Sequence, residues 1–167
     1  MLPGGGSADC GLARQFKSME FNLASAQMAS LKGELEAWVQ AYLQAGEWAN
    51  PGLSSGLKLQ PRWWRGPHEF PLSALQRACG PEPEMEYRMD AEAWAVRTAR
   101  LAASFTTLER LPTLIAEYRQ GVLSIRDGNH RLEAIRLKGW PTAWVLIWYN
   151  SIEDYKADSN SFLSPKP

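Results

Sequence analysis

The strongest constraint on the fold lies in residues 111–149, where short apolar runs surround one glycine-containing loop. Residues 113–118 and 122–126 are strand-like runs joined by a tight turn, which predicts a β-hairpin. Residues 127–129 then break the second strand, residues 130–138 have helical composition, and residues 143–149 form a last apolar run. The order strand, turn, strand, loop, helix, strand predicts an α/β (α+β) fold, a small mixed sheet with packed helices.

The loop leads directly into the helix, with Asn129 as a suitable N-cap. The first N–H groups of a helix lack helical partners, and its dipole adds partial positive charge there. Gly128 permits close backbone approach, and His130 and Arg131 add donors where cations are normally disfavoured. This pattern predicts a phosphate site made by Gly128, Asn129, His130 and Arg131. The alternative is a tight turn with an N-cap. If the site holds phosphate, replacing Arg131 should abolish ligand binding and leave the fold intact.

Asp127 lies beside this loop and could hold a divalent metal or accept a proton. A strong metal site needs a second carboxylate, which the sequence does not identify. Arg77 is a candidate second phosphate contact, and its alternative is a solvated arginine. The candidate carboxylates are Glu82, Glu84, Glu86 and Glu109.

The run DGNHRLEA resembles the signature of the ParB/sulfiredoxin-like superfamily. Gly128, Arg131 and Ala134 match Gly-x-x-Arg-x-x-Ala, and Asp127 and His130 complete the fuller Asp-Gly-x-His-Arg form. The resemblance covers about residues 108–149, extends back toward His68, and does not cover residues 1–60. It implies that the helix begins over the phosphates of a nucleotide (ATP, ADP or CTP), with Mg²⁺.

Members of this superfamily differ in chemistry. Sulfiredoxins place a catalytic cysteine before the His-Arg pair, where this chain has Asn129, and neither Cys10 nor Cys79 is near the motif in sequence. Sulfinic-acid reduction is therefore not expected. ParB partition proteins continue into a helix-turn-helix domain, and fewer than twenty residues follow the last expected strand here, so a partition clamp is not expected either. Free-serine kinases and small plasmid fertility-inhibition proteins resemble the chain more closely and imply phosphotransfer, ATP hydrolysis or DNA cleavage.

Two functions therefore remain open. In the first, the protein is a nucleotide-dependent phosphotransferase, hydrolase or nuclease, with Asp127 and His130 as catalytic residues. In the second, the loop binds a nucleotide without catalysis, and the protein is a sensor or an interaction module with a protein partner. A third possibility is that the motif is only structural.

Composition limits the partners. Eighteen Lys and Arg residues balance eighteen Asp and Glu residues, so DNA could be bound only through a local patch. The candidate patch is Arg62-Trp63-Trp64-Arg65, whose alternative is a loop with its tryptophans packed on the protein. Two histidines and no Cys-x-x-Cys pair argue against a His- or Cys-rich metal site. The longest apolar stretch is too short to cross a bilayer, and the N-terminus lacks signal-peptide features, so we expect a cytoplasmic protein without a membrane segment.

The rest of the chain suggests a helical region before the sheet. One face of a helix expected over residues 30–45 carries the apolar residues Leu31, Leu35, Trp38, Val39, Tyr42 and Leu43. Shorter elements expected further on are a strand at 68–72, a helical turn at 73–78 and a helix at 91–104. The expected organisation is a disordered N-terminus (1–11), a helical extension (12–46), a linker (47–67), the ParB/sulfiredoxin-like domain (68–152) and a tail (153–167).

Overall fold

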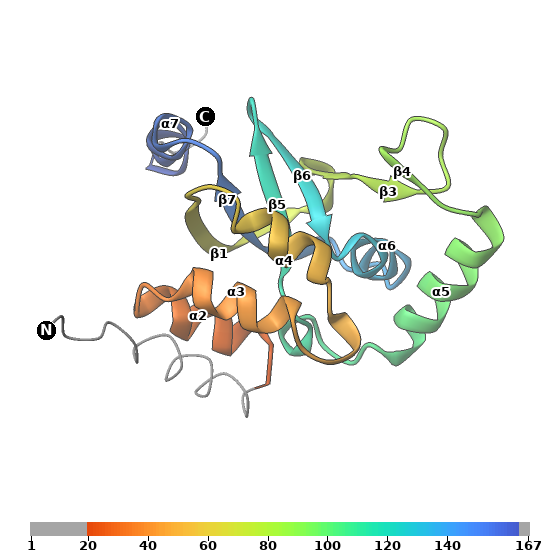
Figure 1. Ribbon diagram of the computed structural model, residues 1–167. Coiled ribbons are helices and arrows are strands. Elements are labelled where there is room, and N and C mark those ends of the chain that lie inside the picture. Colours follow the sequence, from red (N-terminus) through yellow and green to blue (C-terminus); the bar gives the residue numbers. More distant parts are fainter. Residues whose placement is uncertain (1–19, 164–167) are drawn as a thin grey trace, which may run out of the picture.

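A five-stranded mixed sheet forms the centre of the computed structural model, which describes residues 20–163 and the side chains of residues 20–159 (Figure 1). The strand order is β1-β7-β5-β6-β2. β5 pairs antiparallel with β6 and parallel with β7, β1 is antiparallel to β7, and β2 is parallel to β6. The strands are β1 (Trp63–Pro71), β2 (Leu75–Arg77), β5 (Leu114–Arg119), β6 (Val122–Asp127) and β7 (Thr142–Tyr149).

One face of the sheet packs on α6 (Asn129–Leu137), which in turn contacts α5 (Ala91–Ser104). Asp90 caps α5 by accepting the N–H of Ala93 at 2.9 Å. Alternate residues of β5 and β7 point to this face, as the two-residue period of a strand requires. The core on this side includes Ala116, Ile125, Ala134, Ile135, Val145 and Ile147.

The N-terminal helices cover the opposite face (Figure 1). Trp38 and Leu43 are fully buried in a cluster with Ile115, Leu146 and Trp148. These three strand residues alternate with those of the first core, so their side chains point to the other face of the sheet. The amphipathic stripe seen in the sequence therefore forms core from Leu35 onward, whereas Leu31 is exposed. The elements on this side are α2 (Leu23–Leu31), α3 (Leu35–Leu43), the 3₁₀ turn η1 (Gly46–Trp48) and α4 (Pro51–Leu57).

Several boundaries differ from the expectations. The helix expected over residues 30–45 is shorter: residues 30–31 end α2, the chain turns at Gly33, where φ is +69°, and α3 then begins at Leu35. The segment expected to be a linker contains α4, with Asn50 as its N-cap and a proline at its first position, and also the start of β1. The expected helical turn at 73–78 begins as the end of the 3₁₀ turn η2 (Leu72–Ala74) and continues as strand β2.

The remaining elements lie outside the five-stranded sheet. β3 (Cys79–Gly80) and β4 (Tyr87–Arg88) form a separate parallel pair, η3 (Leu108–Arg110) precedes β5, and α7 (Ile152–Leu163) occupies most of the expected tail. The N-terminal residues 1–11 lie outside the described part of the chain. The predicted mixed α/β architecture is confirmed. No helix within residues 20–163 has the length and apolar character needed to span a membrane.

Candidate anion-binding site

The predicted loop lies between the end of β6 and the start of α6. Gly128 is the N-cap, with φ +97° and ψ 22°, and no side chain caps the helix. The first helical bond runs from the N–H of Leu132 to the carbonyl of Gly128 at 2.8 Å. The three N–H groups before it therefore lie outside the helical hydrogen-bond ladder, as an anion site requires.

Asn129 is not the N-cap, which corrects the prediction. Its Oδ1 accepts the backbone N–H of Ala78 at 2.9 Å and of Cys79 at 3.3 Å, and its Nδ2 donates to the carbonyl of Ile125 at 3.0 Å. Asn129 thus fastens the segment after β2 to the loop. It also brings Cys79 to the same cavity, although that cysteine is far from the motif in sequence. Burial raises the pKa of the Cys79 thiol, so it stays protonated near neutral pH.

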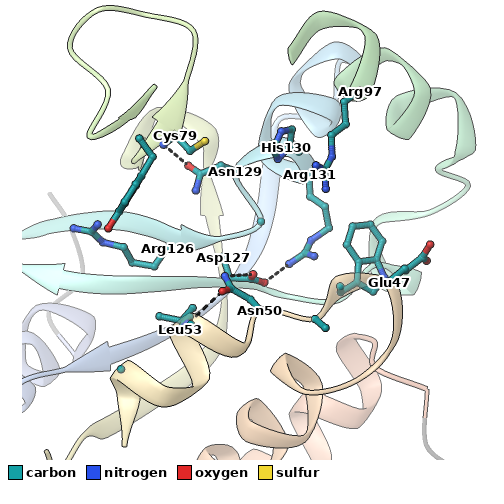
Figure 2. Close-up of a pocket in the computed structure, with 16 residues that line it drawn as sticks. Glu47, Asn50, Leu53, Cys79, Arg97, Arg126, Asp127, Asn129, His130 and Arg131 are labelled. Carbon is teal, nitrogen blue, oxygen red and sulfur yellow. Dashed lines mark hydrogen bonds and ion pairs between the residues drawn. The ribbon is translucent and has the colours of Figure 1, made fainter. Parts of the chain in front are cut away.

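The loop forms part of a cavity of about 560 Å³ (Figure 2). One wall is the end of β6, the start of α6 and Arg97 from α5. The opposite wall is the segment 47–56, which belongs to η1 and α4. The helical extension and the expected linker are therefore part of the site.

Asp127 and Arg131 form a buried ion pair at the base of the cavity (Figure 2). Arg131 is 2% exposed and Asp127 8%, and Arg131 Nη2 lies 3.1 Å from Asp127 Oδ2. Arg131 Nη2 also lies 3.4 Å from the carbonyl of Thr113. In this conformation the guanidinium is directed at Asp127 and not at a free phosphate position. Its Nε is buried without a hydrogen-bond partner.

The N-terminal helices complete this pair through Tyr42, which the sequence predicted only as a member of the apolar stripe, and through Asn50 and Trp48, which it did not single out. The Tyr42 hydroxyl donates to Asp127 Oδ2 at 3.0 Å and accepts from Arg131 Nη1 at 2.6 Å. Asn50 Nδ2 lies 3.4 Å from Asp127 Oδ1, and Arg131 sits over the Trp48 ring at 4.7 Å. Burial, together with the Asp127 charge, raises the pKa of Tyr42 despite the opposing effect of Arg131. No local pattern could have revealed a contact 85 residues apart.

His130 lines the cavity, as the sequence predicted for a site residue. It is half-buried, and its ring centroid lies 4.5 Å from that of Trp94. Burial, together with the charges of Arg97 and Arg131, lowers the pKa of His130 to about 4, so it is neutral at pH 7. Its Nε2 is buried without a hydrogen-bond partner among the described residues.

Two further arginines line the same cavity and were missed. Arg97 is exposed on α5, and its guanidinium makes no hydrogen bond or ion pair with the rest of residues 20–159. Arg126 pairs with Glu86 at 2.9 Å and Glu117 at 3.1 Å, but its Nη2 is buried without a partner. The position of Arg97 in a helix and of Arg126 near a strand end does not indicate in the sequence that both line one cavity.

The other predicted site residues lie outside the cavity. Arg77 pairs with Glu82 and lies 5.0 Å from the Trp94 ring, so these two side chains are engaged with each other. Glu109 is exposed in η3, and Glu84 is exposed as well. No second carboxylate lines the cavity with Asp127 except Glu47, and residues 20–159 contain no group of three or more His, Cys, Asp or Glu placed to hold a metal.

The Arg62-Trp63-Trp64-Arg65 patch lines a second cavity, but its side chains are bonded to or packed on the protein. Arg62 donates to the carbonyls of Leu57 and Gly56 at 3.3 and 3.2 Å, and Arg65 donates to the carbonyl of Tyr155 at 3.0 Å. Trp63 packs against the first core and Trp64 against the second. This geometry agrees with the packing alternative.

Comparison with known proteins returns similarity to solved structures alone. No protein-family profile matches the chain, and no curated protein sequence matches it. Among solved structures, the chain is similar to sulfiredoxin from Arabidopsis thaliana, with 21% identity and a TM-score of 0.38, over 59% of this chain and 97% of that one. It is also similar to C-terminally truncated ParB from Caulobacter crescentus in complex with CTP-gamma-S, with 16% identity and a TM-score of 0.38, over 62% of this chain and 56% of that one. At these TM-scores neither similarity carries an argument about fold or activity.

Proposed function

We propose that the protein binds a nucleotide, with its phosphates at the start of α6. The observation that supports this is the convergence of uncommitted donors on one cavity. The uncapped N–H groups of α6, the Nε2 of His130 and the guanidinium of Arg97 all border it without a partner in the described residues. Donors of this kind satisfy phosphate oxygens.

The charges of the wall at the start of α6 favour an anion. Arg131 and Asp127 neutralise each other, and Arg126 is compensated by Glu86 and Glu117. Arg97 remains as an unpaired cation on the same wall as the helix N-terminus, and Glu47, the remaining carboxylate of the lining, lies on the opposite wall. An anion placed there would also raise the pKa of His130 and draw a proton onto the imidazole.

The size of the cavity and its aromatic residues suit the rest of a nucleotide. About 560 Å³ is within the range of small-ligand sites. Trp48 and Tyr87 line the cavity, and aromatic rings stack with bases of any sequence. Base stacking on either ring is part of the proposal.

Binding without catalysis is the function that the site supports best. For phosphotransfer, ATP hydrolysis or nuclease activity, Asp127 would have to hold Mg²⁺ or accept a proton. Its two oxygens are instead engaged by Arg131, Tyr42 and Asn50. A catalytic role would require Asp127 to leave this network, so we place the enzyme second.

The test is a thermal-shift and calorimetric titration with ATP, ADP, CTP, GTP and inorganic triphosphate, using Arg97→Ala and, as a matched control, Arg100→Ala. Both residues are exposed on α5, but Arg100 does not line this cavity. We expect triphosphates to raise the Tm of the wild type, Arg97→Ala to weaken binding about tenfold as for one charge-assisted contact, and Arg100→Ala to bind normally. Equal affinities in all three proteins, or no binding to the wild type, would refute the assignment.

A second assay separates binding from catalysis. Phosphate release from ATP with Mg²⁺ is measured with and without single- and double-stranded DNA and with free serine as acceptor. The proposal expects binding without turnover above the buffer rate. Turnover that falls by a factor on the order of 10² in Asp127→Asn would favour the enzyme instead.

A further inference from the structure

We propose that Tyr42 is a positioning residue of this site, so that the N-terminal helices are a working part of it. The proposal rests on the nucleotide site proposed above and extends it to a part of the chain that the sequence motif does not reach. Tyr42 lies on α3, is fully buried, and has no place in the cavity lining itself. It acts through the two residues that its hydroxyl joins.

The hydroxyl of Tyr42 completes a closed set of three polar groups. It donates to Asp127 Oδ2 at 3.0 Å and accepts from Arg131 Nη1 at 2.6 Å, while Arg131 Nη2 reaches the same Oδ2 at 3.1 Å. The Tyr42 ring stacks on the Trp38 ring, with the two ring centroids 5.4 Å apart. The position of the hydroxyl is therefore set by the packing of the N-terminal helices.

This set controls the loop that carries the free N–H groups. Asp127 and Arg131 flank Gly128 on either side, and a Cβ at Gly128 would lie only 2.8 Å from Arg131 Nη2. The guanidinium thus packs directly against the loop backbone. Without the Tyr42 hydroxyl, both members of a buried ion pair lose a hydrogen bond, and regaining one requires the loop to shift or water to enter.

The wall opposite the loop depends on the same network. Asn50 lies 3.4 Å from Asp127 through its Nδ2, and its Oδ1 caps α4 by accepting the N–H of Leu53 at 3.2 Å. Trp48 lies over Arg131 at 4.7 Å. A ligand that touches both walls therefore binds the state in which segment 46–57 is docked on the loop, and its binding strengthens that docking by mass action.

The first experiment needs no ligand. Hydrogen exchange of the amides of residues 132–135, the first hydrogen-bonded amides of α6, is compared in the wild type, Tyr42→Phe and Tyr149→Phe. Tyr149 is a matched control because its ring is fully buried in the same sheet and its hydroxyl donates to the carboxylate of Asp158, away from the cavity. We expect faster exchange in these amides for Tyr42→Phe only. Unchanged exchange there, or the same change in Tyr149→Phe, would overturn the proposal whether or not a nucleotide binds.

The second experiment measures affinity for inorganic triphosphate and for ATP by calorimetry. We expect Tyr42→Phe to bind both about tenfold more weakly, the effect of one hydrogen bond to a charged group, and Tyr149→Phe to bind like the wild type. Because Tyr42→Phe could unfold the chain, Asn50→Ser is made as well. Serine can still cap α4 but lacks the amide donor to Asp127, so a smaller loss of affinity in the same direction is expected. Wild-type affinity in both variants would overturn the proposal, and absence of binding to the wild type would refute the nucleotide site alone.

Discussion

Two arginine-containing segments of this chain have the composition of an anion site, and the structure uses them differently. In the patch of residues 62–65, both arginines bond to carbonyls of the chain and tie α4 and α7 to the sheet. At the β6–α6 loop, Arg131 is bound inward, but the helix N-terminus, His130 and Arg97 keep free donors. An arginine marks an anion site only when long-range partners leave its donors unused. The predictions below test that distinction.

The largest effect is expected for the buried pair. Arg131→Met leaves Asp127 buried without its counter-charge, and we expect a loss of about 3–5 kcal/mol in the free energy of unfolding. This reverses the expectation from the sequence, in which the fold would be unaffected. Urea denaturation measures the loss.

A double variant provides its control. Asp127→Asn in the Arg131→Met background removes the unpaired charge, so we expect it to recover more than half of the lost stability. If the two substitutions were simply additive, the ion pair would contribute little, and Arg131 would be free to serve as a direct ligand.

A smaller effect is expected at Gly128. A Cβ there would lie 2.5 Å from Leu114 Cδ2, at a φ of +97°. Gly128→Ala should cost roughly 1–3 kcal/mol more than Gly139→Ala, which has a similar φ of +73° but open space around it. Thermal unfolding of the two variants compares them. Equal costs would mean that the crowding at the loop is relieved without strain.

The patch should behave in the opposite way to the cavity. Arg62→Ala removes bonds to the carbonyls of Gly56 and Leu57, so we expect a loss of about 1–2 kcal/mol of stability. Its affinity for triphosphate should be that of the wild type, whereas Arg97→Ala loses affinity and keeps its stability. Denaturation should therefore show a loss of stability only in Arg62→Ala, and calorimetry a loss of triphosphate affinity only in Arg97→Ala. Loss of nucleic-acid or triphosphate binding in Arg62→Ala would contradict the distinction between the two segments.

The smallest effect is a pH dependence at His130. Its folded pKa of about 4 lies below the ordinary value of 6.5, so the unfolded chain takes up a proton first as the pH falls. Its contribution to stability is present above pH 6.5 and is lost between pH 6.5 and 4. NMR titration should show the low pKa without ligand and a higher one with triphosphate. His130→Gln should flatten that part of the stability profile, and an unchanged His130 pKa with ligand would place the anion elsewhere.

Local signals in the sequence were sufficient for the hairpin, the loop and the helix around Gly128. The turn residues, the glycine and the apolar periods all act within a few positions of each other. The orientation of the Arg131 side chain was not predictable, because its contacts are distant in sequence. Tyr42 lies 89 residues before Arg131, and Asn50 lies 77 residues before its partner Asp127. The role of Asn129 depended in the same way on Ala78, 51 residues earlier. Local patterns thus predicted the fold around the loop, but they could not predict which hydrogen-bond donors are already bonded within the protein.

The placement of Tyr42 also bears on the order in which the chain can fold during synthesis. Its hydroxyl bonds to Asp127, 85 residues later, which at 5–20 residues per second emerges roughly 4–17 s afterwards. Trp38 and Leu43 need Leu146 and Trp148, which emerge later still. During synthesis the apolar face of the N-terminal helices is therefore exposed until the strands that cover it have been made. This is the stage at which a chaperone would engage the nascent protein.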